Sequence, residues 1–261
     1  MNIKSITRPY RAFNEDAIVI KDNLFVVIDG ATGLHEKSTN VSLASQMVND
    51  MQTFLETSPI DDFEQCLLDL ARNLQEKYQY SGEKSMIPSA SLAALHIKNN
   101  MVYMNQLGDC SISYQTKNIH RFTDQRLIKL DHIGKKMLLE LQRYNDFESA
   151  LSQVKPTLIK HRNLMNETNG YMAFQPSLMP KFEIKSKRIR LKDLKSFLIY
   201  SDGYYSARDT FKLYKNHEMF YCSKIEQTIQ SIIDAAYQAN SLIQYPRFKI
   251  IDDISVIKVD L

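Results

Sequence analysis

The stretch LFVVIDGATGL, Leu24 to Leu34, places five apolar residues before a carboxylate, and two glycines follow within four positions. The apolar run is typical of a buried strand, and the Asp-Gly pair predicts a tight turn at its end. A turn former is the ordinary interpretation of Asp29. The alternative is a metal ligand held at the edge of a sheet, and the other acidic residues of the chain bear on that choice.

Several other carboxylates stand where an apolar run ends or begins. Asp109 follows MVYMNQLG, Asp202 follows FLIYS, and Asp252 opens the last apolar segment, while Glu15 and Asp16 directly precede the first one. For any one aspartate, a turn or a helix cap is the commoner role. Because strand ends on one edge of a sheet can meet, the ordered set favours a shared site over separate turns.

Glycine is scarce in this chain, with only seven residues, so the position of each one is informative. Gly30, Gly33, Gly108 and Gly203 all lie within four residues of an aspartate that ends an apolar run. This placement predicts tight turns built around the carboxylates.

The chemistry of such a set points to hard divalent cations. Carboxylates at one site repel each other unless cations hold them, and oxygen-only ligands favour Mg²⁺ or Mn²⁺ over zinc. Two such ions roughly 3.5–4 Å apart are a common device for hydrolysing phosphoesters, because they lower the pKa of a bridging water. Arg11, four residues before Glu15, is the candidate to grip two oxygens of the phosphate.

Composition limits the other possibilities. The net charge of +3 is small, and the basic run from Lys185 to Lys192 alternates with apolar residues like a strand with one solvated face, so no nucleic-acid partner is expected. Three cysteines without a CxxC pair fit a reducing cytoplasm. Neither a signal peptide nor a membrane span of ~20 apolar residues is present in the sequence. We expect a monomeric cytoplasmic protein with a single domain over residues 1–261.

Periodicity gives the expected elements. Strands are predicted at 17–20, 24–28, 181–191, 195–203 and 251–259, and helices end near Thr57 and Tyr78. Residues 91–122 read as a meander of antiparallel strands, residues 126–164 as helical, and 204–214 and 224–243 as helices. The stretch from Met165 to Pro180 reads as a loop that borders the cleft as a flap. This order suits an α+β sandwich rather than a doubly wound fold.

The ordered motifs resemble those of the metal-dependent PPM (type 2C) protein phosphatases. The matching segments are RAFNED (11–16), IDG (28–30), GD (108–109), YSDG (200–203) and DDISV (252–256), and they span residues 7–260. The segments YPRFKIIDDISVIKV and HRNLMNETNGY look most like those of bacterial members. The resemblance implies a four-layer α-β-β-α sandwich, with two mainly antiparallel sheets and a dinuclear metal cleft at one end.

The resemblance also implies a role for each site residue. Asp29 would bridge two Mg²⁺ or Mn²⁺ ions, the Gly30 carbonyl would bind one of them, and Asp202 and Asp252 would complete the shell of the other. Asp253 stands where the family usually has Asn, and we take it as the neighbour of the ligand.

The remaining carboxylates and Arg11 have secondary roles in this scheme. Glu15 and Asp16 would act through bound waters, and Asp109 would help to hold a weak third ion. Arg11 would bind the substrate phosphate.

Three positions depart from the family pattern. Ala31 stands where many eukaryotic members have a histidine that acts as a general acid. Ser89-Ala90-Ser91 replaces a Gly-Thr-Thr-like block, and Ser206 replaces an aspartate, which puts the third ion in doubt.

The function implied is a phosphoprotein (Ser/Thr) phosphatase, in which a hydroxide bridging two divalent metals hydrolyses the phosphomonoester. The alternative is a non-catalytic or weakly active module of the same fold that binds a partner or a phosphoprotein. A haloacid dehalogenase-type hydrolase is excluded, because its nucleophilic Asp would have to occupy Val27.

Overall fold

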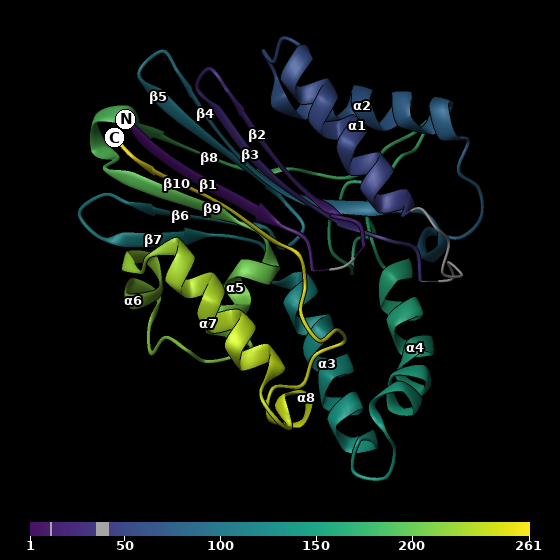
Figure 1. Ribbon diagram of the computed structural model, residues 1–261. Helices are drawn as coiled ribbons and strands as arrows, with labels where there is room; N and C mark the ends of the chain where they lie inside the picture. Colours follow the sequence, from purple (N-terminus) through teal and green to yellow (C-terminus); the bar gives the residue numbers. More distant parts are fainter. Residues whose placement is uncertain (11, 35–41) are drawn as a thin grey trace.

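The computed structural model describes residues 1–10, 12–34 and 42–261. Within these residues the chain forms two antiparallel sheets of five strands each (Figure 1). The first sheet has the strand order β1 (Asn2–Arg8), β10 (Ile254–Asp260), β9 (Ser196–Tyr200), β6 (Ser111–Gln115) and β7 (Ile119–Phe122). The second has the order β2 (Asp16–Lys21), β3 (Leu24–Ala31), β4 (Ser89–Lys98), β5 (Met101–Leu107) and β8 (Lys185–Arg190).

Helices cover the outer face of each sheet. Helices α1 (Leu43–Thr57) and α2 (Phe63–Tyr78) pack on the β2–β3–β4 side, and α5 (Asp202–Asp209), α6 (His217–Cys222) and α7 (Ile225–Tyr237) pack on the β9–β10 side. A third apolar layer lies between the sheets, where Phe25 of β3 meets Phe197 of β9 edge to face. The predicted four-layer α-β-β-α sandwich is therefore confirmed.

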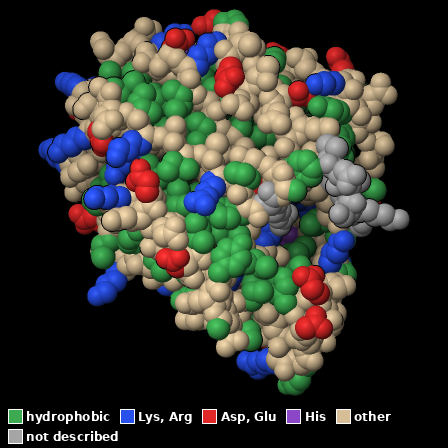
Figure 2. Space-filling view, in the orientation of Figure 1, with side chains coloured by type: hydrophobic (Ala, Val, Ile, Leu, Met, Phe, Trp, Pro, Cys, Tyr) green, Lys and Arg blue, Asp and Glu red, His purple; other side chains and the backbone are tan. Residues whose placement is uncertain are grey.

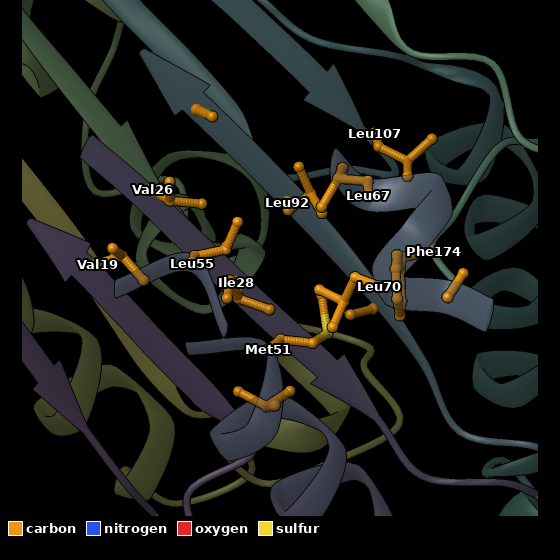
Figure 3. Packing of buried hydrophobic residues seen from close by; sticks show 14 of the residues in the cluster. Val19, Val26, Ile28, Met51, Leu55, Leu67, Leu70, Leu92, Leu107 and Phe174 are labelled. Carbon is orange, nitrogen blue, oxygen red and sulfur yellow. The ribbon is translucent and has the colours of Figure 1, made fainter. Parts of the chain in front are cut away.

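Helical periodicity builds the layer under α1 and α2. Met51 and Leu55 of α1 and Leu67 and Leu70 of α2 pack in one cluster with Ile28 of β3 (Figure 3). The five side chains are buried, with at most 2% of their surface exposed, and burial of each contributes about 1.5–3 kcal/mol. This packing fixes strand β3, whose last residues enter the candidate site.

A helical hairpin extends beyond one end of the sandwich (Figure 1). It consists of α3 (Arg126–Leu141) and α4 (Phe147–Asn163), so the helical stretch predicted over 126–164 is two helices. The break comes where Asp146 caps α4 by accepting a hydrogen bond from Ser149 N. Leu138, Ala150 and Val154 seal the hairpin, and Phe248 packs against them.

The Asp-Gly pair predicted a turn at Asp29, but strand β3 does not turn there. It continues to Ala31, and its residues 29–31 pair with Ser91, Ala90 and Ser89 of β4. A Cβ at Gly30 would lie 2.5 Å from the Glu15 carbonyl oxygen and 2.6 Å from Val48 Cγ2. The close approach of Glu15 and Val48, rather than a turn, explains why residue 30 is a glycine.

The predicted meander over 91–122 is wrong in one respect. β4 pairs with β5 and β6 pairs with β7, but β5 and β6 belong to different sheets. The crossing occurs at Gly108, whose φ of +83° lies in the left-handed region that glycine adopts most readily.

Three other segments differ from prediction. The helix expected over 204–214 ends at Asp209, and α6 follows it as a separate helix. The helix expected over 224–243 ends at Tyr237, and a short helix α8 (Ser241–Gln244) follows Asn240, whose φ is +60°. Strand β1 was not predicted, because its exposed residues show no apolar alternation and its pairing partner is β10, at the far end of the chain.

The described surface carries mixed charges. On the face shown in Figure 2, Lys and Arg side chains are interspersed with Asp and Glu. No helix within the described residues is both long and apolar enough to cross a membrane.

Candidate metal centre

Two of the predicted site residues lie side by side on neighbouring strands. Asp16 opens β2 and Asp29 lies near the end of β3, and the antiparallel register places them directly opposite each other. Asp16 is only 5% exposed. The apolar residues before Asp29 anchor its strand in the core, so both carboxylates are held at one edge of the second sheet.

The first sheet brings two more carboxylates to the same place. Asp202 is the first residue of α5, directly after β9, and Asp252 lies just before β10. The two segments are tied by Ser201 and Ser255: Ser201 N donates to the Ser255 carbonyl and Ser255 N donates to Ser201 Oγ, both at 3.0 Å.

Asp109 joins from the connection that crosses between the sheets. Its backbone N–H donates to Ser91 Oγ at 3.2 Å, and Ser91 is paired with Asp29 across β3 and β4. A Cβ on Gly108 would collide with Ser91, so the crossing requires this glycine. Ser91, which the sequence presented as a departure from the family pattern, therefore positions Asp109.

The buried carboxylates of this group perturb one another electrostatically. Burial raises the pKa of Asp29 well above its usual range, and the charges of Asp16, Asp202, Asp109 and Asp252 raise it further. Burial and the charges of Asp252 and Asp109 raise the pKa of Asp202 to about 7. A side-chain hydrogen bond with Asp29 acts in the opposite direction and lowers the pKa of Asp202.

A further carboxylate, Asp131 of α3, was missed by the sequence analysis. Burial raises its pKa to about 6, with contributions from Asp202 and Asp209, and its charge also raises the pKa of Asp109. Asp131 belongs to no motif and follows no apolar strand. Only the packing of α3 against the end of the sandwich brings it to the site.

The residues fit a divalent cation. The cluster offers only oxygen donors, which suit Mg²⁺ or Mn²⁺, and its mutual repulsion is the kind that a cation relieves. Asp16 Oδ2 is buried without a hydrogen-bond partner among the described residues, which is rare for a carboxylate oxygen. Within the described residues, no group of three or more His, Cys, Asp or Glu side chains is already arranged so that it could hold a metal ion.

The Glu15 carboxylate is held by two neighbouring hydroxyl groups. Its Oε1 accepts hydrogen bonds from the hydroxyls of Thr32 and Ser42, the latter at 2.5 Å, and Ser42 also caps α1. Asp253 accepts hydrogen bonds from Tyr10 N and Glu15 N, each at 2.8 Å, and so holds both ends of residues 10–15 against β10. Arg11 lies outside the described residues.

Two cavities open beside the acidic centre. One, of about 130 Å³, is lined by Asp109, Asp202 and Asp252. The other, of about 580 Å³, runs between α3, α4 and the end of β3. Asp131 and Lys249 line both.

The backbone of Ala31, which lines the larger cavity, is held by helix α4. The Ala31 carbonyl accepts a hydrogen bond from Arg162 Nη2 of α4 at 2.8 Å. From the loop expected over 165–180, Tyr171 also lines this cavity, and Phe174 pairs with Ala90 of β4. The loop thus borders the site, as predicted.

Comparison with known proteins gives a match in structure but not in sequence. No family model and no curated protein matches the chain. Among solved structures, the serine/threonine phosphatase Stp1 from Staphylococcus aureus is 16% identical, with a TM-score of 0.55 over 99% of this chain and 94% of that one. PppA from Pseudomonas aeruginosa, described as a key regulatory component of T6SS, is 14% identical, with a TM-score of 0.57 over 100% and 99%.

A third structure bears on the metal question. The catalytic domain of the serine/threonine protein phosphatase PstP, in complex with two manganese ions, is 13% identical, with a TM-score of 0.51 over 99% of this chain and 97% of that one. Because the identities are so low, the comparisons establish only that the chain has the fold of these bacterial proteins.

Proposed function

We propose, from the premise that this chain has the fold of bacterial serine/threonine phosphatases, that it is itself a metal-dependent phosphoprotein phosphatase of the PPM (type 2C) family. The observation that carries the proposal is the electrostatic coupling of buried Asp29, near the end of β3, with Asp202 and Asp252, which flank strands of the other sheet. A fold can be retained without its chemistry. Grouping buried, mutually repelling carboxylates weakens the folded protein, and a cation-binding role accounts for that arrangement.

The proposed ligands follow the predicted scheme. Asp29 would be shared by two Mg²⁺ or Mn²⁺ ions, with the Gly30 carbonyl on one side and Asp202 and Asp252 on the other. Asp16, with its unpartnered buried oxygen, would act through water. Asp109, beside Asp131, would hold a weak third ion.

Glu15 was predicted to act on the metals through bound water, and here we propose a mainly structural role for it. Its carboxylate already binds the hydroxyls of Thr32 and Ser42, so we propose that it acts mainly by fixing the end of β3 against α1.

The chemistry divides between the ions and the chain. Divalent ions bound here would lower the pKa of an attacking water and neutralise the phosphate oxygens. The chain itself would bury and orient the carboxylates, and Arg11 would grip the phosphate. The Ala31 side chain has no proton to donate, so the residue at that position does not protonate the leaving alkoxide.

The substrate class and setting belong to the same proposal. We propose a phosphorylated protein as substrate and a monomeric bacterial protein in the cytoplasm, with neither nucleic acid nor membrane as a partner. The cysteines Cys66, Cys110 and Cys222 are all free, which suits a reducing compartment.

The proposal is tested by replacing Asp29. In excess Mn²⁺, Asp29→Asn removes the shared ligand while keeping the side-chain shape, and hydrolysis of a phosphoserine peptide should fall at least about a thousandfold. Asp61→Asn is the matched control, because the Asp61 side chain is 94% exposed and far from the site in its ion pair with Lys98. It should retain full activity.

The non-catalytic alternative predicts a different result. If the unaltered protein binds the phosphopeptide but releases no phosphate with Mn²⁺ or Mg²⁺, the chain is a binding module of this fold. If hydrolysis survives Asp29→Asn, the assignment of Asp29 is wrong.

A further inference from the structure

The acidic centre contains its own counter-cation. Lys249 Nζ lies 2.6 Å from Asp252 Oδ1, and the two side chains are about equally buried, with 34% and 32% of their surface exposed. Lys249 lines both cavities beside the centre. Its charge also lowers the pKa values of Asp202 and Asp131. The ammonium group therefore lies among the carboxylates rather than on an open surface.

The backbone around Lys249 is fixed by a neighbouring arginine. Arg247 is only 7% exposed and donates hydrogen bonds to the carbonyls of Ser241, Tyr245 and Ile250 at 2.8–2.9 Å. Its guanidinium also lies 5.0 Å from the centre of the Phe211 ring. These contacts hold the segment between α8 and β10, so the placement of Lys249 is built into the fold.

An ordinary surface ion pair would not explain this placement. Exposed ion pairs between residues three apart contribute little to stability. Asp252 Oδ1 accepts from both Lys249 Nζ and the Asp253 backbone N–H, the latter at 3.1 Å. One oxygen of the proposed ligand is thus already occupied by donors from the chain itself.

We infer that Lys249 is an intramolecular competitor for the divalent ion at Asp252. Its ammonium group neutralises Asp252 while no metal is bound, and a divalent cation must displace it to bind there. The inference rests on the proposed function only in taking Asp252 as a metal ligand. It predicts that this chain binds that ion more weakly than the same carboxylates would without the lysine, so that metal concentration controls activity.

The test is Mn²⁺ binding by isothermal titration calorimetry on the full chain. Lys249→Met keeps the length of the side chain and removes its charge, and we expect Mn²⁺ to bind about tenfold more tightly. Lys249→Arg keeps the charge and should bind Mn²⁺ as the unaltered protein does. Lys135→Met is the matched control, because Lys135 lines the smaller cavity and acts on Asp131 but is not paired with Asp252. It should change the affinity less than about twofold.

Thermal unfolding provides a second readout. In EDTA, Lys249→Met should unfold at a lower temperature than the unaltered protein, because Asp252 loses its counter-cation. In excess Mn²⁺, Lys249→Met should gain more stability than the unaltered protein does.

The outcomes separate this inference from the proposed function. If the unaltered protein binds Mn²⁺ and Lys249→Met binds it no more tightly, the inference is wrong and the phosphatase proposal stands. If Lys249→Met binds Mn²⁺ more weakly, Lys249 supports the metal site and the inference is also wrong. If neither protein binds Mn²⁺, both proposals fail.

Discussion

At the scale of single residues, the site is governed by how many carboxylates share one buried space. Asp202 illustrates the consequence, because its pKa is raised from 3.8 to about 7 by burial first and then by Asp252 and Asp109. An acid that binds its proton more tightly when folded lowers the free energy of unfolding as the pH rises from about 4 through about 7. Without metal, the acidic centre therefore weakens the protein at neutral pH.

The direction of this pH dependence of stability can be tested with Asp202→Asn, because the new side chain carries no charge at any pH. In EDTA, the unfolding temperature of the variant minus that of the unaltered protein should increase by at least about 3 °C between pH 5 and pH 8. His217, whose pKa is lowered to about 4 by burial and by two arginines, is common to both proteins, so its opposite pH dependence cancels. A difference that stays constant between the two pH values would contradict the linkage.

The metal-site candidates differ in how visible they are in the sequence. Asp29, Asp109, Asp202 and Asp252 were predictable, because each stands where an apolar run ends or begins and a strand must carry it to the sheet edge. Asp131 was not, since it lies within an ordinary amphipathic helix, and its position depends on how α3 packs.

At the scale of elements, the connections hold the site together as much as the strands do. The crossing at Gly108 carries Asp109 from one sheet to the other, and Ser91 of β4 holds it by its backbone N–H. The sequence indicated both strands of this crossing but not that they join different sheets, because apolar alternation records which faces are buried and not which strand lies alongside. β1 was missed for a related reason: its partner β10 is about 250 residues away in the chain.

The connection before β2 depends on Asp253. Its two oxygens accept the backbone N–H groups of Tyr10 and Glu15, and the residue is 5% exposed. Asp253→Ala removes both acceptors and should lower the free energy of unfolding by about 2–4 kcal/mol in urea. Asp253→Asn keeps the shape and one acceptor oxygen, so it should lose about half as much.

This pair of variants also separates two physical effects. The pKa of Asp253 is raised by burial, and Asp252 beside it adds to that shift, so its charge opposes folding even as its hydrogen bonds favour it. If Asp253→Asn proved more stable than the unaltered protein, charge repulsion would outweigh the hydrogen bonds and the anchoring role would be wrong.

At the scale of the whole molecule, the two sheets matter because they end together. β2 and β3 deliver Asp16 and Asp29, while β9 and β10 deliver Asp202 and Asp252, and the α3–α4 hairpin stands beside that end (Figure 1). The order of the elements predicted an α+β sandwich, and the resemblance to the PPM phosphatases supplied its four layers. The hairpin's contribution to the cavities, through Asp131 and Arg162, required the structure.

The neighbours in structure share this fold over nearly their whole length at only 13–16% identity. At that distance the layers are retained while most side chains differ, so the identity of the fold and the activity of the chain are separate questions. The activity depends on whether the acidic end of the sandwich loads metal and turns over a phosphoester.

The most direct measurement is phosphate release from a phosphoserine peptide by the unaltered protein, with millimolar Mn²⁺ in one assay and EDTA in the other. A dinuclear hydrolytic centre at Asp29, Asp202 and Asp252 predicts release at least about a hundredfold faster with Mn²⁺ than with EDTA. Equal rates in the two assays, or no release with either Mn²⁺ or Mg²⁺, would contradict it.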